Sequence, residues 1–154
     1  MKRDGSTTSL WQDKMEDYVS QTTVFPAQPF DVVIAGGGVT GVATALQLQR
    51  SGKRCLILEA HNLCFGTTGG TTSHLNTFFD TDYDTIRKDF GEDAIHLVAS
   101  ATNKALDLYK TNIEQYAIDC GYAEKDGYLY SQTAEQTEML EKIYEASLLA
   151  GVGW

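Results

Sequence analysis

A glycine-rich turn offers the clearest ligand chemistry in this sequence. Gly36-Gly37-Gly38-Val39-Thr40-Gly41 follows an apolar run and matches the pattern G-x-G-x-x-G. Gly36 permits a tight turn, Gly38 lets the backbone approach a pyrophosphate, and Gly41 allows close packing of a helix on a sheet. The free N–H groups at the start of that helix favour an anion. The motif therefore predicts a pyrophosphate site, and its alternative interpretation is a flexible glycine loop.

An acidic residue stands where such a site needs one. Glu59 follows Gly41 by eighteen residues and ends the apolar run Cys55-Leu56-Ile57-Leu58. A carboxylate at the carboxyl end of a second strand can accept hydrogen bonds from the ribose hydroxyls of an adenosine. The turn and the acid together predict that the chain binds a dinucleotide.

These residues must be positioned by a β-α-β unit, which we expect over 30–59. Residues 31–35 are apolar and β-branched, as in a buried parallel strand. The segment up to Gly52 has helical periodicity, and 55–58 is a second strand. The predicted fold class is α/β: an incomplete Rossmann-like domain that binds FAD or NAD(P), leading into the start of an α+β substrate domain.

The predicted domain organisation has three parts. Residues 1–28 form a polar leader, 29–120 the N-terminal portion of the dinucleotide-binding domain, and 121–154 the start of a truncated substrate domain. A dinucleotide fold needs further strands beyond the first two. We therefore expect the chain to be the N-terminal part of a longer protein.

Helical periodicity predicts elements on both sides of the motif. A short amphipathic helix is expected over about 10–19, docked through Leu10 and Trp11. A second helix is expected over 83–90. A long helix should run over about 92–119, with Gly121 as its stop. Its apolar positions are Ala94, Val98, Ala101, Ala105, Leu108, Tyr109, Ile113 and Tyr116.

The C-terminal region predicts a hairpin and a last helix. Residues 122–132 alternate around Asp126-Gly127, which suggests a β-hairpin. Thr133-Ala134-Glu135-Gln136 matches a capping box that opens a helix to about Ala150. The expected buried stripe of that helix comprises Met139, Leu140, Ile143, Tyr144 and Leu148.

Composition excludes several classes of partner. The formal net charge of −9 over 154 residues opposes binding to nucleic acid or to an anionic membrane. No window is long and apolar enough to span a bilayer. Cys55, Cys64 and Cys120 suggest neither a disulfide framework nor a metal site. The simplest location is a reducing cytoplasm.

Acidic residues near position 80 raise the question of a metal. Asp80, Asp82 and Asp84 have the spacing that opens a calcium loop, but Thr85 replaces the needed glycine and Gly91 the closing glutamate. No metal is predicted, and we expect these acids to cap the following helix.

The glycine motif does not separate FAD from NAD, but the next segment favours FAD. Phe65-Gly66-Thr67-Thr68-Gly69-Gly70-Thr71-Thr72-Ser73-His74 is rich in hydroxyls and small residues that can wrap an extended cofactor. With the glycine turn and Leu58-Glu59-Ala60, it resembles the FAD-dependent D-amino-acid oxidase family, which includes glycine and sarcosine oxidases. The resemblance covers about 30–76. Ser9-Leu10-Trp11-Gln12 is similar to bacterial members that carry a C-terminal Rieske domain.

The resemblance implies a set of cofactor contacts. Besides the motif glycines Gly36, Gly38 and Gly41, the residues at family FAD-contact positions are Val39, Thr40, Glu59, Ala60, Thr67, Thr68, Thr72 and Ser73. Gly70 departs from the family, which often has Arg or Asn there. His74 is a candidate near the flavin, where related dehydrogenases attach FAD covalently through a histidine. Its alternative role is a histidine hydrogen-bonded to backbone.

The resemblance also implies a reaction. FAD would oxidise a C–N bond of an amine or amino acid by hydride transfer, and oxygen or an electron carrier would reoxidise the flavin. Two alternatives stay open. One is an NAD-dependent dehydrogenase, with Glu59 disfavouring the 2′-phosphate of NADP. The other is a non-catalytic dinucleotide-binding module.

Overall fold

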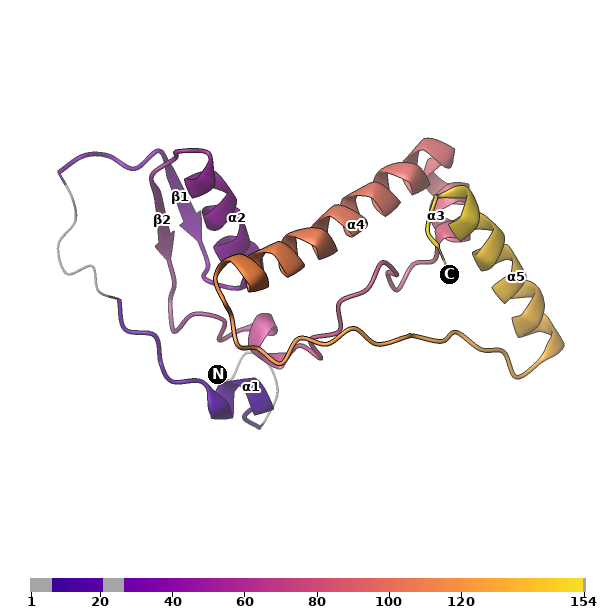
Figure 1. The fold of residues 1–154 in the computed structure, drawn as a ribbon, viewed down its shortest axis with the longest axis horizontal. Coiled ribbons are helices and arrows are strands. Elements are labelled where there is room, and N and C mark those ends of the chain that lie inside the picture. The colour runs from indigo at the N-terminus through magenta and orange to yellow at the C-terminus, as the bar shows by residue number, and fades with distance from the viewer. Residues whose placement is uncertain (1–6, 21–26, 154) are drawn as a thin grey trace. The chain divides into compact units, whose positions relative to one another are not determined.

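The computed structural model describes residues 7–20 and 27–153 and divides into two compact units (Figure 1). The first unit is Met1–His74 and the second is Leu75–Trp154. The predicted domain boundary near residue 120 stays a prediction. In the described part of the chain, no helix is both long and apolar enough to cross a membrane.

The first unit contains the predicted β-α-β arrangement. Strands β1 (Val32–Ala35) and β2 (Cys55–Leu58) pair in parallel, with Val32 opposite Cys55 and Ala35 opposite Leu58. Helix α2 (Val39–Arg50) connects them. The parallel pairing needs this crossover helix, because a tight turn can join only antiparallel strands. The two strands agree with the start of the predicted α/β sheet and cover only that start.

The N-terminal helix is shorter than predicted. Helix α1 (Leu10–Lys14) begins at a capping box formed by Ser9 and Gln12 and ends before the extended Met15. The prediction that it continues to Val19 is therefore wrong. Leu10 is 58% exposed and does not dock the helix. Trp11 does, through an indole N–H bond to the Thr71 carbonyl.

The second unit is a small helical cluster. Helices α3 (Tyr83–Phe90), α4 (Glu92–Gln115) and α5 (Ala134–Leu149) contact one another. Their shared core comprises Tyr83, Ile86, Ile95, Ala99, Ala146, Ala150 and Val152. The predicted range of α3 is confirmed. Helix α4 starts as predicted but ends at Gln115, because Ala117 adopts a left-handed backbone with φ of 48°.

The buried faces of the two longer helices follow the predicted apolar positions only in part. On α4, the core receives Ile95 and Ala99, and the predicted positions Ala94 and Val98 pack against it, whereas Ala101, Ala105, Tyr109 and Tyr116 are exposed. On α5, Met139, Tyr144 and Leu148 are exposed, and the buried residues are Ala146 and Ser147. Small side chains let α5 approach α3 closely, and the Ser147 hydroxyl is satisfied by the Ile143 carbonyl at 2.7 Å.

The predicted hairpin is absent. The described segment 122–132 contains no strand, and Tyr128 is 82% exposed. A two-stranded hairpin without a surface to pack on is marginal in water, which explains the difference. Instead, an ion pair of 2.5 Å joins Glu124 to Lys110 on α4.

At the start of α5, only one of the two hydrogen bonds of the predicted capping box forms. The Thr133 side chain accepts a bond from the Gln136 N–H, as predicted. The Gln136 side chain, however, accepts from the N–H of Gln132 rather than of Thr133.

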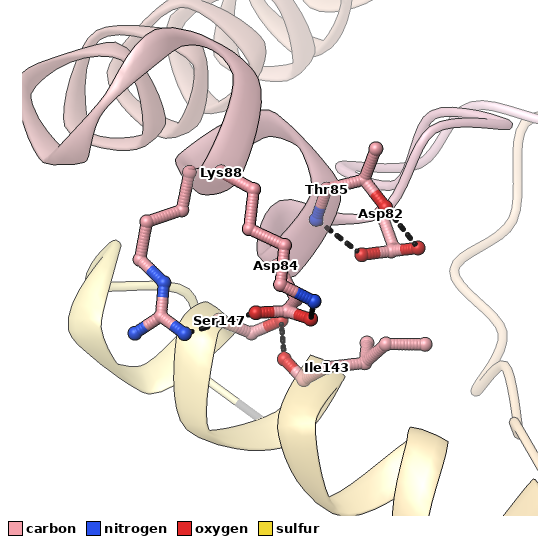
Figure 2. A network of polar contacts seen from close by, with 7 residues as sticks. Asp82, Asp84, Thr85, Lys88, Ile143 and Ser147 are labelled. Carbon is pink, nitrogen blue, oxygen red and sulfur yellow. Dashed lines mark hydrogen bonds and ion pairs between the residues drawn. The ribbon is translucent and has the colours of Figure 1, made fainter.

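Two acidic residues at the start of α3, Asp82 and Asp84, make polar contacts that are drawn in Figure 2. Asp82 is the N-cap and accepts from the Thr85 N–H at 2.8 Å, so the capping role expected for these acids is confirmed for Asp82. Asp84 is only 6% exposed and pairs with Lys88 at 2.5 Å and Arg87 at 2.9 Å. The Lys88 ammonium, ahead of the Arg87 guanidinium, lowers the pKa of Asp84.

Candidate dinucleotide site

The glycine turn has the geometry that its motif requires. Gly36 has φ of +102°, a backbone conformation that side chains disfavour, and its N–H donates to the Leu58 carbonyl at 2.8 Å. A Cβ at Gly41 would overlap the carbonyl oxygen of Gly36. The turn is therefore tight, and α2 packs directly against it.

Glu59 is bound to the glycine turn itself. Its Oε2 accepts the N–H of Gly37 at 2.7 Å, and its Oε1 accepts the N–H of His61 at 3.0 Å. The Gly37 bond is the main reason that the pKa of Glu59 is lowered, and the His61 bond is second. A carboxylate has about four acceptor positions, and the backbone N–H of Ala60 also contributes to the lowered pKa, so Glu59 can still accept at least one more donor.

The start of α2 is joined to the hydroxyl-rich loop. Thr68 Oγ1 accepts the N–H of Val39, the first residue of the helix, at 3.0 Å. The helical bonds begin only with Val42 N–H to Gly38, which leaves the N–H groups of Thr40 and Gly41 without a helical acceptor. This end of α2 can therefore donate to an anion next to the Thr68 hydroxyl.

The loop contacts the glycine turn at a second point. Cys64 has φ of 61°, and its N–H donates to the Gly37 carbonyl at 2.9 Å. Helix η1 (Thr67–Gly70) follows and places Thr67 and Thr68 beside each other. Glu59, Cys64 and Thr68 thus converge on the turn from different parts of the sequence.

The remaining predicted residues are not brought to the turn. Ala60, Thr72, Ser73 and His74 are exposed, and in the described part of the chain no bond joins their side chains to Gly36–Gly38. His61 is also exposed, and its ring lies 5.1 Å from that of Phe65. The roles of these residues stay predictions.

Sequence reasoning predicted that Trp11 docks the N-terminal helix, but it missed the loop as the target and the contacts of Ser9 and Gln12. Ser9 Oγ donates to the Gly69 carbonyl, Trp11 Nε1 to Thr71 at 2.7 Å, and Gln12 Nε2 to Phe65 at 2.8 Å. The available signal was the S-x-x-Q spacing of Ser9 and Gln12, which predicts a helix start. No local pattern specifies what that helix would contact.

The residues present fit an adenine dinucleotide such as FAD. A Cβ at Gly38 would lie 3.0 Å from Thr68 Oγ1, so glycine leaves open the space between the turn and the loop. The free N–H groups at the start of α2 could bind an anion at that point, and Glu59 retains acceptor capacity for hydroxyls. The combination is the donor and acceptor set that a pyrophosphate and a ribose require.

Comparison with known families agrees with this geometry. The FAD dependent oxidoreductase family, which includes the D-amino-acid oxidases, matches residues 31–153. The chain belongs to this family of FAD-binding oxidoreductases.

Curated relatives extend the similarity. The protein named "Putative Rieske 2Fe-2S iron-sulfur protein YhfW" of Bacillus subtilis is 32% identical over 89% of this chain and 28% of its own length. Gamma-glutamylputrescine oxidoreductase of Escherichia coli is 29% identical over 88% of this chain and 32% of its own. The chain thus spans about a third or less of these relatives. No solved structure matches significantly.

Proposed function

We propose that this protein uses FAD to oxidise a C–N bond of an amine or amino acid. The observation that carries the proposal is the convergence of Glu59 and Thr68 on the glycine turn in a chain of this family. The amine class is supported by the relative named gamma-glutamylputrescine oxidoreductase. When bound, FAD supplies the acceptor for the hydride that leaves the carbon next to nitrogen.

The chain's own residues would bind and orient the cofactor. The N–H groups of Thr40 and Gly41 and the Thr68 hydroxyl would hold the pyrophosphate, and Glu59 the ribose hydroxyls. The other proposed contact residues are Gly36, Gly38, Val39, Ala60, Thr67, Thr72 and Ser73. His74 is the candidate next to the flavin ring.

The electron acceptor is proposed as oxygen or an electron carrier. Similarity to a protein named for a Rieske iron–sulfur centre supports the carrier. A flavin reoxidised by a carrier transfers its two electrons singly to a one-electron centre, whereas oxygen takes both and yields hydrogen peroxide. Measuring peroxide formed per substrate oxidised separates the two.

A visible spectrum of the protein expressed from its complete reading frame tests the proposal. We expect flavin absorption bands that bleach anaerobically when the right amine or amino acid is added. A flavin that no amine or amino acid reduces would overturn the proposed substrate class. A colourless protein that gains nothing from added FAD but binds NAD would establish the nicotinamide alternative, and tight FAD binding without reduction by any donor would favour a non-catalytic module.

Acid precipitation of the same sample tests His74. Colour that stays in the pellet and disappears in His74→Ala would show covalent attachment through this residue. If flavin content, spectrum and turnover are unchanged in His74→Ala, the residue has no role at the flavin.

A further inference from the structure

We propose that five residues, the N-terminal clamp, position residues 62–72, the cofactor loop, for FAD binding. The clamp residues are Ser9, Trp11, Gln12, Asp17 and Tyr18. The inference rests on the proposed function, because it assigns the clamp a role in FAD affinity. Both segments belong to the first unit, and several hydrogen bonds join them across 44 to 60 residues of sequence. The clamp residues would act through the loop, as positioning residues.

Side chains of the clamp donate hydrogen bonds to backbone carbonyl groups in the middle and at the end of the cofactor loop. Trp11 Nε1 donates to Thr71 at 2.7 Å, and Gln12 Nε2 donates to Phe65 at 2.8 Å. Between them, Ser9 Oγ donates to the carbonyl of Gly69, a buried glycine. A Cβ at Gly69 would lie 2.7 Å from the Cys64 carbonyl oxygen and 2.9 Å from Gln12 Nε2, and the backbone contact is the one that requires glycine here. Three side chains thus orient three peptide planes of the loop.

The clamp also holds the beginning of the loop. The Asn62 side chain donates to Asp17 Oδ1 at 2.6 Å and accepts the N–H of Tyr18 at 3.1 Å. Anchoring at both ends matters because a loop of about ten residues otherwise loses considerable conformational entropy when it closes on a ligand. A loop held before the cofactor arrives has less entropy to lose.

Peptide geometry connects these bonds to the cofactor. In a trans peptide the N–H points opposite to the C=O. Bonds from Gln12 to Phe65 and from Trp11 to Thr71 therefore direct the N–H groups of Gly66 and Thr72 away from the clamp. Within the described residues, neither N–H donates to a protein acceptor. They are donors available to cofactor oxygens.

Two hydrogen bonds connect the cofactor loop to the glycine turn and the start of α2. Cys64 N–H donates to the Gly37 carbonyl, and Thr68 Oγ1 accepts the Val39 N–H. Thr68 lies between the carbonyl held by Gln12 and the one held by Ser9. The position of its hydroxyl beside the pyrophosphate site therefore depends on clamp residues that need not touch the cofactor.

Two conservative variants test the clamp by titration of the flavin-free protein, prepared from the complete reading frame, with FAD. Trp11→Phe removes the five-membered ring with its N–H donor and keeps a six-membered aromatic ring. Gln12→Glu keeps the acceptor that caps α1 through the Ser9 N–H, but loses the donor to Phe65. We expect each to raise the Kd for FAD roughly 5- to 10-fold, as loss of one or two hydrogen bonds would. Leu10→Ala, on the same helix and exposed, is the control and should leave the Kd unchanged.

The melting temperature of the flavin-free protein separates positioning from a structural role. Support for the clamp is a raised Kd with a melting temperature equal to that of Leu10→Ala. An unchanged Kd in both variants, or a Kd that rises only in step with lost stability, overturns the inference. If one variant fails to fold, the other decides, because each breaks a different contact. A wild-type protein that binds no FAD overturns the proposed function and the clamp together, whereas normal wild-type binding with unchanged variants overturns the clamp alone.

Discussion

The backbone N–H of Gly37 donates to Glu59 Oε2 at 2.7 Å, across 22 residues of sequence. This bond ties the acidic end of β2 to the central glycine of the turn. It orients the carboxylate before any ligand arrives, because the His61 N–H holds the second oxygen. Glu59 is therefore part of the turn's own structure as well as a candidate ribose acceptor.

Replacing this carboxylate tests both roles. Glu59→Gln places an NH₂ group against the N–H of either Gly37 or His61, because an amide has only one acceptor oxygen. We expect the Kd for FAD to rise about tenfold or more, since hydrogen bonds to a charged group are lost. Equilibrium titration with FAD measures the change. Glu141→Gln, an exposed substitution of the same type on α5, should bind FAD like the wild type.

The lowered pKa of Glu59 predicts a pH dependence of stability. The Gly37 N–H is its largest cause, and the ordinary value is 4.5. A carboxyl with a lowered folded-state pKa contributes stability that is fully present above the unfolded pKa and is lost as pH falls through the folded one. The melting temperatures of wild type and Glu59→Gln should therefore differ most above pH 4.5 and converge in more acidic buffer. A difference that is independent of pH would contradict this linkage.

In the first unit, alanine should be destabilising at Gly41 and tolerated at Gly70. Gly41→Ala would push a Cβ into the Gly36 carbonyl and separate α2 from the turn. Gly70→Ala meets no heavy atom within 4 Å. We expect Gly41→Ala to reduce thermal stability and FAD binding sharply, and Gly70→Ala to retain the flavin-free melting temperature. Circular dichroism melting of both variants measures this, and equal tolerance would show that the turn can move away from α2.

In the second unit, the stability lost when an apolar side chain of α4 is truncated should depend on how deeply that side chain is buried. Ile95 is completely buried, so Ile95→Ala should cost about 2–5 kcal/mol of the free energy of unfolding. Leu97 lies two residues further along the helix and is 71% exposed. Leu97→Ala should therefore change the free energy of unfolding by about 0.5 kcal/mol or less. Urea denaturation measures both. Similar costs for the two variants would mean that Leu97 is also buried in solution.

The parts of the fold that could be predicted are those with local causes. The strand 32–35, the glycine turn and the strand 55–58 follow from a β-branched run, a steric requirement for glycine and a second apolar run. Asp82 caps α3 through a residue only three positions away. The start of α1 had such a local signal in Ser9 and Gln12, although its end at Lys14 did not.

The incorrect predictions concern features that depend on contacts between segments far apart in the sequence. Periodicity indicates the apolar positions of α4 and α5, but burial depends on which helix packs against which. Ala146 and Ser147 are buried because α3 approaches α5 at that point, while the larger Met139 and Leu148 lie outside the contact. Residues 122–132 alternate like a hairpin, yet no packing surface stabilises strands there.

By itself, the sequence determined the dinucleotide motif, the β-α-β unit and the position of Glu59, because each depends on glycine sterics or on residues adjacent along the chain. Only the tertiary structure decided that Glu59 bonds to Gly37, that Thr68 reaches the start of α2, and that Trp11 and Gln12 hold the cofactor loop. These contacts join residues 22 to 60 positions apart. Such contacts form only when the whole unit folds, and no local pattern encodes them.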